Sequence, residues 1–533
     1  MRRFGIMLDC SRNAVPTVNS LTKWIDVISD MGYNTLLLYM EDTYEVDNHP
    51  YFGYMRGRYT QEELRRIDGY ALKKGVELIP CIQTLAHLQS IERWPEYWGH
   101  FDCADILCVG DEKNYELIDG MFSALSGCIT SKTIHIGMDE AHLLGKGRYY
   151  EKNGAVDGSQ IMIEHLQRIC EIGKKYGFTF LIWSDMFFKL AAGNYLYDAN
   201  ANISEAIAGQ IPENVELVYW DYYSQEQEQY DAMFAAHQKL KENTWFAGGM
   251  LSWAGFAPHN AYSIQTIRVA LQSCLKNKVQ DVFFTMWGDC GGECSRFALL
   301  PTLFYAAEIL RGNTDEMQIK QNFQEKFGIS FDDFMLLDLP GTPNDMKGEI
   351  CNAEKYMLYN DCFTGIMDAQ VRGGEGEAFA KCAERLQRLT DHPDWGYLFE
   401  TQKALCETLE KKAELGRRTR LAYKNKDKAA IRQLQSDYQE CIKRLAKFHA
   451  KYRQQWYIEN KPHGFDVQDI RLGGLSARLL SCAERLQSFL KDEISCIEEL
   501  EEKQLDYFGI APDNREPHTW VANWSHIATT NVV

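Results

Sequence analysis

The chain has 533 residues, of which 45% are hydrophobic and 12% aromatic, and this is enough apolar material for at least two packed domains. The formal net charge of −18 disfavours general binding to nucleic acid or to anionic membrane surfaces. The sequence shows no signal peptide and no apolar run of membrane-spanning length, so the sixteen cysteines are expected to be reduced thiols in a cytoplasmic protein.

Short apolar runs that end in polar residues alternate with helix-periodic stretches over the first three-fifths of the chain. This alternation favours a parallel sheet covered by helices, and a total of eight runs predicts closure into a (β/α)8 TIM barrel, an α/β fold. An open doubly wound sheet is the alternative, but it would need a Gly-rich turn that residues 9–13 lack. The eight runs are 4–11, 35–42, 77–84, 133–140, 179–186, 215–222, 244–253 and 282–289.

Charged stretches with helical periodicity replace the strand-like runs in the last part of the chain. We therefore predict a barrel over 1–313 and an α-helical C-terminal domain over 314–533. The segment 456–466 interrupts the helical pattern, and it is expected to be a connector or a loop that reaches the barrel mouth. The predicted helical stretches are 349–367, 377–389, 397–424, 428–452 and 475–505.

The fourth run ends abruptly on two adjacent carboxylates, Asp139 and Glu140. Neighbouring acids at the end of an apolar strand repel each other and cost desolvation energy, so their presence indicates chemistry. A helix N-terminus, capped by Asp139, is the competing interpretation. In a TIM barrel, catalytic residues sit at the C-terminal ends of the strands. The polar and aromatic residues at these ends include Arg12, Glu41, Gln83, His87, Trp183, Asp185, Tyr219, Asp221, Tyr223, Trp253, Trp287, Asp289 and Glu293.

Several tryptophans and carboxylates at one rim suit a sugar, because aromatic faces stack on C–H faces while carboxylates bind hydroxyls. Most glycosidases place two carboxylates on opposite sides of the scissile bond, and the adjacent Asp139 and Glu140 are poorly placed for that. A substrate-assisted route fits them better: Glu140 would protonate the leaving oxygen, while Asp139 would hold a substrate group that attacks the anomeric carbon.

Residues 135–140 resemble the His-x-Gly-Gly-Asp-Glu signature of glycoside hydrolase family 20, the β-N-acetylhexosaminidases. Segments 8–12, 39–44, 219–221 and 287–289 are similar to further motifs of the family, in the family's order. Met138 stands where the signature has its second glycine. The acid pair comes early in the chain, so the arrangement resembles the short, barrel-first branch that lacks an N-terminal α/β domain.

The resemblance implies an exo-acting, retaining enzyme that hydrolyses terminal non-reducing N-acetylglucosamine or N-acetylgalactosamine through an oxazolinium intermediate. It implies that Asp139 orients the 2-acetamido group and that Glu140 is general acid and then general base. Tyr219 would hold the acetamido oxygen, with Tyr223 as the alternative. The implied substrate-binding residues are Arg12 on O3 and O4, Asp289 or Glu293 on O4 and O6, Asp221 on a hydroxyl, the walls Trp183, Trp253 and Trp287, and His87, which could orient carboxylates.

Other interpretations stay open. The barrel could bind sugar without cleaving it, or it could be a metal-dependent hydrolase with His135, Asp139 and His142 as ligands. Cys290 and Cys294 have no second pair to complete a zinc site, so no metal and no cofactor are expected. The expected partner is a small-molecule, oligosaccharide or glycoconjugate substrate with a terminal β-linked N-acetylhexosamine, without nucleic acid or membrane. The C-terminal helices could also form a homo-oligomer surface.

Overall fold

The computed structural model describes residues 1–193, 197–343, 349–509 and 519–532. The chain forms two compact units, and their boundary does not fall at one position in the sequence. The first unit comprises residues 1–250, 265–286 and 306–312, and the second comprises 251–264, 287–305 and 313–533. The division predicted at residue 313 stays a prediction.

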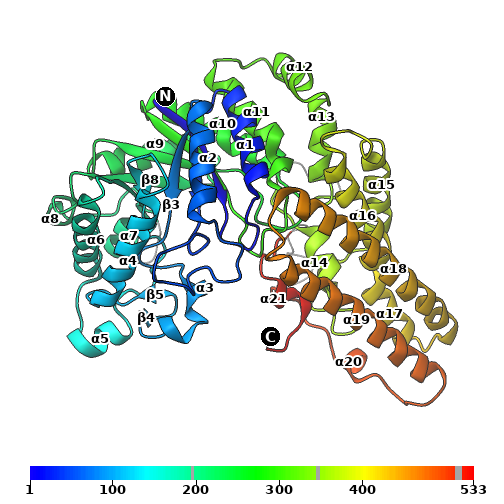
Figure 1. Ribbon diagram of the computed structural model, residues 1–533. Coiled ribbons are helices and arrows are strands. Elements are labelled where there is room, and N and C mark those ends of the chain that lie inside the picture. The colour runs from blue at the N-terminus through cyan, green and yellow to red at the C-terminus, as the bar shows by residue number, and fades with distance from the viewer. Residues whose placement is uncertain (194–196, 344–348, 510–518, 533) are drawn as a thin grey trace. The chain divides into compact units, whose positions relative to one another are not determined.

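A closed barrel of eight parallel strands forms the first unit (Figure 1). The order around the barrel is β1-β10-β9-β8-β7-β6-β3-β2, so β1 closes the ring by pairing with both β2 and β10, where Leu8 lies opposite Leu38 and Met286. The predicted (β/α)8 fold is confirmed. The strands are β1 Arg3–Asp9, β2 Thr35–Tyr39, β3 Glu77–Cys81, β6 Thr133–His135, β7 Thr179–Trp183, β8 Val215–Asp221, β9 Thr244–Gly249 and β10 Asp281–Met286.

The two ends of the barrel differ: ion pairs lie near the strand starts, and packed aromatic rings lie further along the strands. Near the strand starts, Arg2 pairs with Asp281 and Arg3 Nε lies 2.8 Å from Glu77 Oε2. Further along the strands, the ring of Trp183 packs against His135, with ring centroids 4.4 Å apart. The charged end therefore serves stability, whereas the opposite end is the one at which barrel chemistry occurs.

Helices follow the strands of the barrel, and some of them begin with side-chain caps. Thr17 caps α1, and Thr60 and Glu63 form a reciprocal capping box at α2. A small antiparallel hairpin, which we did not predict, lies in the loop after β3. The elements are α1 Val18–Asp30, α2 Gln61–Lys73, α3 Gln89–Glu92, η1 Pro95–Tyr97, β4 Phe101–Cys103, β5 Ile106–Leu107, α4 Glu112–Ser126, α5 Arg148–Asn153, α6 Gly158–Lys174, α7 Asp185–Ala192, α8 Glu205–Ala208, α9 Gln227–Gln238, α10 Asn260–Lys276, η2 Arg296–Leu299 and α11 Leu300–Leu310.

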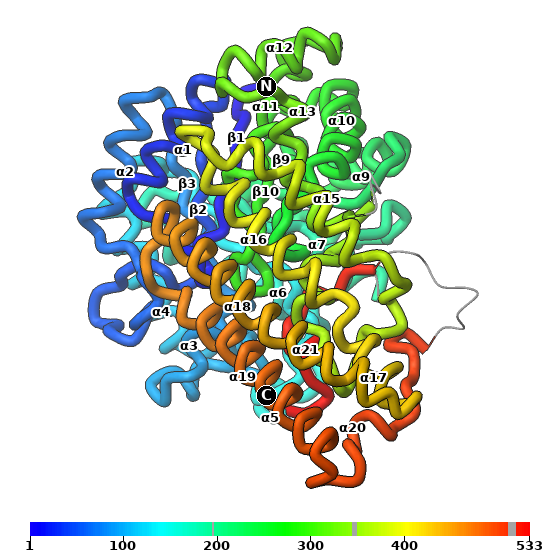
Figure 2. The backbone as a smooth tube through the Cα atoms, turned by 90° about the vertical axis from the view of Figure 1, so that its right-hand side faces the viewer, coloured from blue at the N-terminus to red at the C-terminus, as the bar shows by residue number. Residues whose placement is uncertain are grey.

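Helices make up the second unit, and α15, α16, α18 and α19 pack as successive neighbours (Figure 2). The predicted helix over 475–505 is wrong at both ends, because α19 begins at Phe465 and ends at Leu490. The expected connector over 456–466 is shorter than predicted: α18 continues to Glu459 and α19 begins at Phe465, so only residues 460–464 connect the two helices. The elements are α12 Glu316–Phe327, α13 Phe331–Phe334, η3 Met335–Asp338, α14 Ala353–Tyr359, η4 Asp368–Gln370, α15 Glu375–Gln387, α16 Gly396–Lys412, α17 Leu415–Lys424, α18 Lys428–Glu459, α19 Phe465–Leu490, α20 Glu498–Glu501 and α21 Trp524–Ala528.

Among the described residues, every helix is too short or too polar to cross a membrane.

Candidate active site

The acid pair lies just beyond the end of β6, in a segment with an unusual backbone. Gly137, Met138 and Glu140 have φ values of 71°, 70° and 49°, in the left-handed region that side chains other than glycine rarely adopt. A Cβ atom at Gly137 would overlap Gln83 Oε1 and come within 2.8 Å of the carbonyl oxygen of Ile82. Close packing at the strand end thus requires glycine at 137, whereas Met138 adopts the same φ with its side chain buried.

Two neighbours hold the Asp139 side chain, which is only 12% exposed. Gln83 Nε2 donates to Asp139 Oδ1 at 2.8 Å, and His87 Nε2 lies 3.3 Å from Oδ2. Burial alone would raise the pKa of Asp139, but the charge of His87 and the contacts from His87 and Gln83 hold it below its ordinary value. Burial would likewise lower the pKa of His87, yet the Asp139 carboxylate raises it to about 9. The pair is therefore an ionised carboxylate beside an imidazolium at neutral pH.

Glu140 differs from its neighbour in exposure, because its side chain is 39% exposed. Glu140 Oε2 lies 3.6 Å from His87 Nε2, so one histidine faces both acids. The backbone N–H of Glu140 donates to Asp185 Oδ2 at 3.0 Å, in the first turn of α7. Burial and the charge of Asp139 raise the pKa of Asp185 to about 8. The two adjacent acids thus occupy unequal environments, as a division of roles requires.

A chain of polar contacts connects the first three strands to the acid pair. Arg12 Nη1 lies 3.0 Å from Glu41 Oε1, and this oxygen also accepts from the Tyr39 hydroxyl at 3.1 Å. Gln83 Nε2 donates to the same hydroxyl at 2.8 Å and so connects Tyr39 to Asp139. The structure therefore brings Arg12 and His87 into one network with the two acids.

Tyr219 and Asp221 of β8 are hydrogen-bonded to each other. The Tyr219 hydroxyl donates to Asp221 Oδ2 at 2.8 Å, and Asp221 Oδ1 accepts from the backbone N–H of Tyr223 at 3.0 Å. Tyr219 is buried, whereas the side chain of Tyr223 is exposed. Between them, Trp220 Nε1 donates to Asp185 Oδ1 at 3.4 Å and connects this strand to the Glu140 backbone.

The predicted tryptophans occupy different surroundings. Trp183 is buried in the barrel interior against His135. Trp253 and Trp287 belong to the second unit, where the Ser252 hydroxyl donates to the carbonyl oxygen of Trp287 at 2.8 Å. Their roles as walls of a sugar site stay predictions.

The two predicted acids beyond β10 also belong to the second unit and differ in exposure. Asp289 is exposed. Glu293 is buried, and its two carboxylate oxygens lie 2.6 Å from Lys355 Nζ and 3.0 Å from Arg471 Nη1. This ion-paired state gives Glu293 a structural role in the helical unit, and its predicted contact with a sugar hydroxyl stays untested.

Within the described ranges, a single group of histidine, cysteine and acidic side chains has metal-ligand spacing. His87, Asp139 and Glu140 each offer one ligand atom, and these atoms lie within 4.8 Å of one another. The metal hypothesis named His135 and His142 instead. His135 Nδ1 accepts from the Gly137 backbone N–H at 3.1 Å, and burial lowers its pKa to about 3, while His142 is exposed.

Glu41, Gln83 and Asp185 are central to the network, but no role was predicted for them. Each one closely follows a barrel strand, and all three were predicted to lie at the strand ends for that reason. Side-chain contacts across strands cannot be read from spacing along the chain. For this reason the pairing of Gln83 with Asp139 had no counterpart in the sequence pattern.

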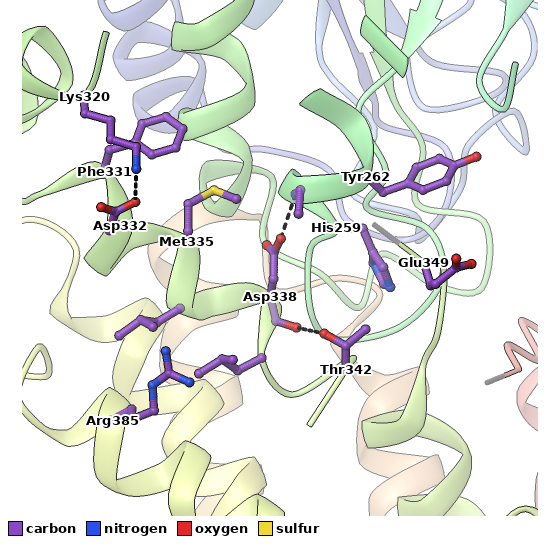
Figure 3. A pocket seen from close by; sticks show the side chains of 13 residues that line it. His259, Tyr262, Lys320, Phe331, Asp332, Met335, Asp338, Thr342, Glu349 and Arg385 are labelled. Carbon is purple, nitrogen blue, oxygen red and sulfur yellow. Dashed lines mark hydrogen bonds and ion pairs between the residues drawn. The ribbon is translucent and has the colours of Figure 1, made fainter. Parts of the chain in front are cut away.

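A separate cavity of about 480 Å³ lies within the helical unit (Figure 3). Asp338 Oδ2 accepts from the backbone N–H of Ala261 at 2.9 Å in the first turn of α10, and burial raises the pKa of Asp338 to about 7. Lys320 Nζ lies 2.7 Å from Asp332 Oδ1 at its edge. No predicted site residue lines this cavity.

Known proteins resemble part of this chain. Human Hexosaminidase D is 25% identical over 40% of this chain and 43% of its own length, and bovine Hexosaminidase D is 22% identical over 50% and 75%. The matched region therefore spans less than half of the human relative. A solved exo-β-N-acetylglucosaminidase from Vibrio harveyi, 15% identical with a TM-score of 0.47, covers 63% of this chain and 58% of its own.

Two family models cover most of the sequence. The catalytic domain of glycosyl hydrolase family 20 matches residues 3–240. The glycoside hydrolase 20C C-terminal domain matches residues 332–519. Because both models describe parts of the same enzyme family, the chain belongs to glycoside hydrolase family 20.

Proposed function

We propose that the protein is an exo-acting, retaining β-N-acetylhexosaminidase that removes terminal N-acetylglucosamine or N-acetylgalactosamine by substrate-assisted hydrolysis. The observation that carries this proposal is the unequal treatment of the two adjacent acids. Asp139 is buried and kept ionised beside His87, whereas Glu140 is more exposed. Membership of family 20 and the hexosaminidase names of the relatives support it.

In the first step, the carbonyl oxygen of the 2-acetamido group attacks the anomeric carbon. The bond from that carbon to the leaving oxygen breaks, and Glu140 transfers its proton to this oxygen. The nitrogen of the resulting oxazolinium ring carries positive charge, and Asp139 accepts its N–H. An ionised Asp139 is required here, and the His87 imidazolium supplies the charge that keeps it so.

In the second step, water attacks the same carbon and reopens the ring. Glu140 now accepts a proton from the water, and the acetamido group is restored. Two displacements at one carbon retain the β configuration. The hydroxyl of Tyr219 in β8 is proposed to donate a hydrogen bond to the acetamido oxygen, and Asp221 is proposed to orient this hydroxyl.

The decisive experiment measures hydrolysis of aryl β-N-acetylglucosaminide and β-N-acetylgalactosaminide, with and without a thiazoline mimic of the cyclic intermediate. We expect cleavage of at least one substrate, inhibition by the thiazoline, and a β product seen first by NMR. Glu140→Gln should lower turnover by about 10²-fold or more on substrates with poor leaving groups and far less on activated ones. Equal losses on both would refute the proton-donor role.

Two alternatives are distinguished in the same assay. Because His87, Asp139 and Glu140 have metal-ligand spacing, loss of activity after treatment with a chelator, restored by a divalent cation, would support a metal-dependent hydrolase. Thiazoline binding without cleavage would support a barrel that only binds sugar. We further propose a reducing, cytoplasmic compartment, because all sixteen cysteines are free thiols.

A further inference from the structure

Three aromatic side chains gather on two loops that follow neighbouring barrel strands. Tyr51 and Tyr54 lie in the loop between β2 and α2, and Trp94 lies in the loop after β3, between α3 and η1. The ring centroid of Trp94 is 5.4 Å from that of Tyr51 and 5.5 Å from that of Tyr54. Tyr51 is 42% exposed and Tyr54 is 40% exposed. We call these three residues the aromatic platform.

The loop that carries the two tyrosines is held in place by arginines. Arg56 Nε lies 3.0 Å from Asp42 Oδ1, and its Nη2 donates to the carbonyl oxygen of Ser11. Arg58 Nη1 donates to the carbonyl oxygens of Pro50, at 3.0 Å, and of Phe52. The exposed rings are therefore presented by a fixed loop, so their exposure does not result from a lack of tertiary contacts.

The two loops are also joined to each other. The Tyr97 hydroxyl, just beyond Trp94, lies 3.4 Å from His49 Nδ1 in the tyrosine loop. Tyr97 is buried, so this contact lies inside the protein, whereas Tyr51 and Tyr54 are exposed and Trp94 is half-buried. Such a contact keeps the rings of the two loops in one arrangement.

The chain places the aromatic platform at the edge of the candidate site. Arg56 is anchored to Ser11 and Asp42, the direct neighbours of Arg12 and Glu41. Tyr54 is two residues from Arg56, and two residues of chain span at most about 7 Å. On the other loop, Trp94 follows His87, whose Nε2 lies 3.6 Å from Glu140 Oε2. One loop thus leads to the aromatic platform from the Arg12–Glu41 pair, and the other leads to it from His87 beside the acid pair.

We propose that the aromatic platform binds a sugar ring of the leaving group, beyond the bond that is cleaved. This inference rests on the proposed function, and it specifies the substrate as a β-linked oligosaccharide or glycan chain. Glu140 gives its proton to the leaving oxygen, so the leaving group lies on the side of Glu140 and His87, from which the Trp94 loop starts. Aromatic faces stack on the C–H faces of a pyranose, and exposed tyrosine hydroxyls bind its hydroxyl groups.

The test compares two substrates that differ only in the leaving group. A β-1,4-linked trisaccharide of N-acetylglucosamine reaches the aromatic platform, whereas the methyl β-glycoside of N-acetylglucosamine is too small to do so. We expect Trp94→Ala and Tyr54→Ala to raise KM for the trisaccharide by about tenfold, with kcat little changed. The methyl glycoside should keep its kcat/KM within about twofold.

Trp98→Ala is the matched control, because Trp98 is 65% exposed and lies four residues from Trp94 outside the aromatic platform. This variant should leave KM and kcat unchanged for both substrates. If Trp94→Ala and Tyr54→Ala change kcat/KM for both substrates by the same factor, or for neither substrate, the platform proposal is wrong. Circular dichroism and the unchanged methyl glycoside rate show that the variants are folded.

Failure of the platform and failure of the proposed function give different results. If the native protein cleaves no N-acetylhexosaminide, the hydrolase proposal fails, and trisaccharide binding is then measured by calorimetry on the native chain and on Trp94→Ala. Weaker binding by the variant would still support the aromatic platform. Equal binding, or none to the native chain, would overturn it.

Discussion

At the scale of single residues, His87 controls the charge of the candidate site, because its imidazolium faces both carboxylates. We expect His87→Gln to raise the pKa of Asp139, since the positive charge that holds it down is removed. The acidic limb of the kcat/KM profile should then move to higher pH, and kcat/KM at pH 5 should fall by about tenfold or more. A profile measured from pH 4 to 9 checks this.

His142→Gln is the control for this prediction, because His142 is an exposed histidine two residues from Glu140. Its acidic limb should match that of the native enzyme. If the acidic limb of the kcat/KM profile does not move in His87→Gln, the pKa of Asp139 does not depend on the His87 imidazolium.

Replacing a glycine can cost stability through backbone strain and through steric overlap of the new Cβ. Gly137 and Gly75 allow the two costs to be measured separately, because they have nearly the same φ, 71° and 72°. Gly75 has open space around it, whereas a Cβ at Gly137 would overlap Gln83. Gly75→Ala should lower the free energy of unfolding by about 1 kcal/mol through backbone strain alone. Gly137→Ala should cost about 2 kcal/mol more, because the overlap adds to the strain. Unfolding in urea measures both, and equal losses would mean that the Gln83 contact yields freely.

At the scale of elements, Glu354 joins α14 to the segment 251–264. Its Oε1 accepts from the backbone N–H groups of Phe256, at 2.8 Å, and Ala257, at 3.1 Å. Burial raises its pKa from 4.5 to about 7, so between these values the folded state binds more protons than the unfolded state. This group's contribution to stability therefore falls as pH rises from about 4.5 through 7.

We expect the free energy of unfolding of Glu354→Gln to decline less between pH 5 and pH 8 than that of the native chain, by about 2 kcal/mol. Denaturant midpoints at the two pH values measure the difference. Parallel declines in the two proteins would show that Glu354 ionises normally in the folded state.

The strand starts could be predicted to within one residue, because an apolar run begins at or next to the first residue of each barrel strand. The ends could not, because the predicted runs extended into the polar loop residues that follow, such as Asp42 after β2 and Glu140 after β6. The hairpin of β4 and β5 is too short to show a period. In the helical unit, α19 was predicted to begin ten residues late, because charged residues in its first turns hide the apolar face.

The acid pair and its motif could likewise be identified from the sequence, because adjacent carboxylates at a strand end are conspicuous. The environments of the two acids could not be predicted, since the contacts that hold Asp139 come from Gln83 and His87, in the segment that follows β3. The burial of Glu293 by Lys355 and Arg471 also depends on contacts between residues far apart in the chain.

At the scale of the whole molecule, the second unit includes segments 251–264 and 287–305, which lie among barrel elements in sequence. Asn352 Nδ2 donates to the carbonyl oxygen of Ala254 at 2.7 Å, and Lys355 pairs with Glu293. A chain that ends at residue 313 keeps Glu293 and loses both of its cationic partners. We expect it to aggregate, because removing the partner of a buried charge is strongly destabilising.

Soluble yield and size-exclusion chromatography test this expectation. Co-expression of residues 314–533 should restore soluble protein, because it returns the missing partners. A monomeric, active barrel from the short chain alone would show that the second unit is dispensable for folding.

The pairing of β1 with β10 has a consequence for biosynthesis. Arg2 and Asp281, which pair at this seam, are 279 residues apart in the sequence. At roughly 5–20 residues per second, the ribosome needs about 15 to 55 s to make the chain between them. During that time the nascent β1 has one open edge, and an open edge is a template for pairing with other chains. The barrel therefore cannot close until β10, which ends at Met286 of 533 residues, has been made, and chaperones that shield nascent strands are expected to raise the yield.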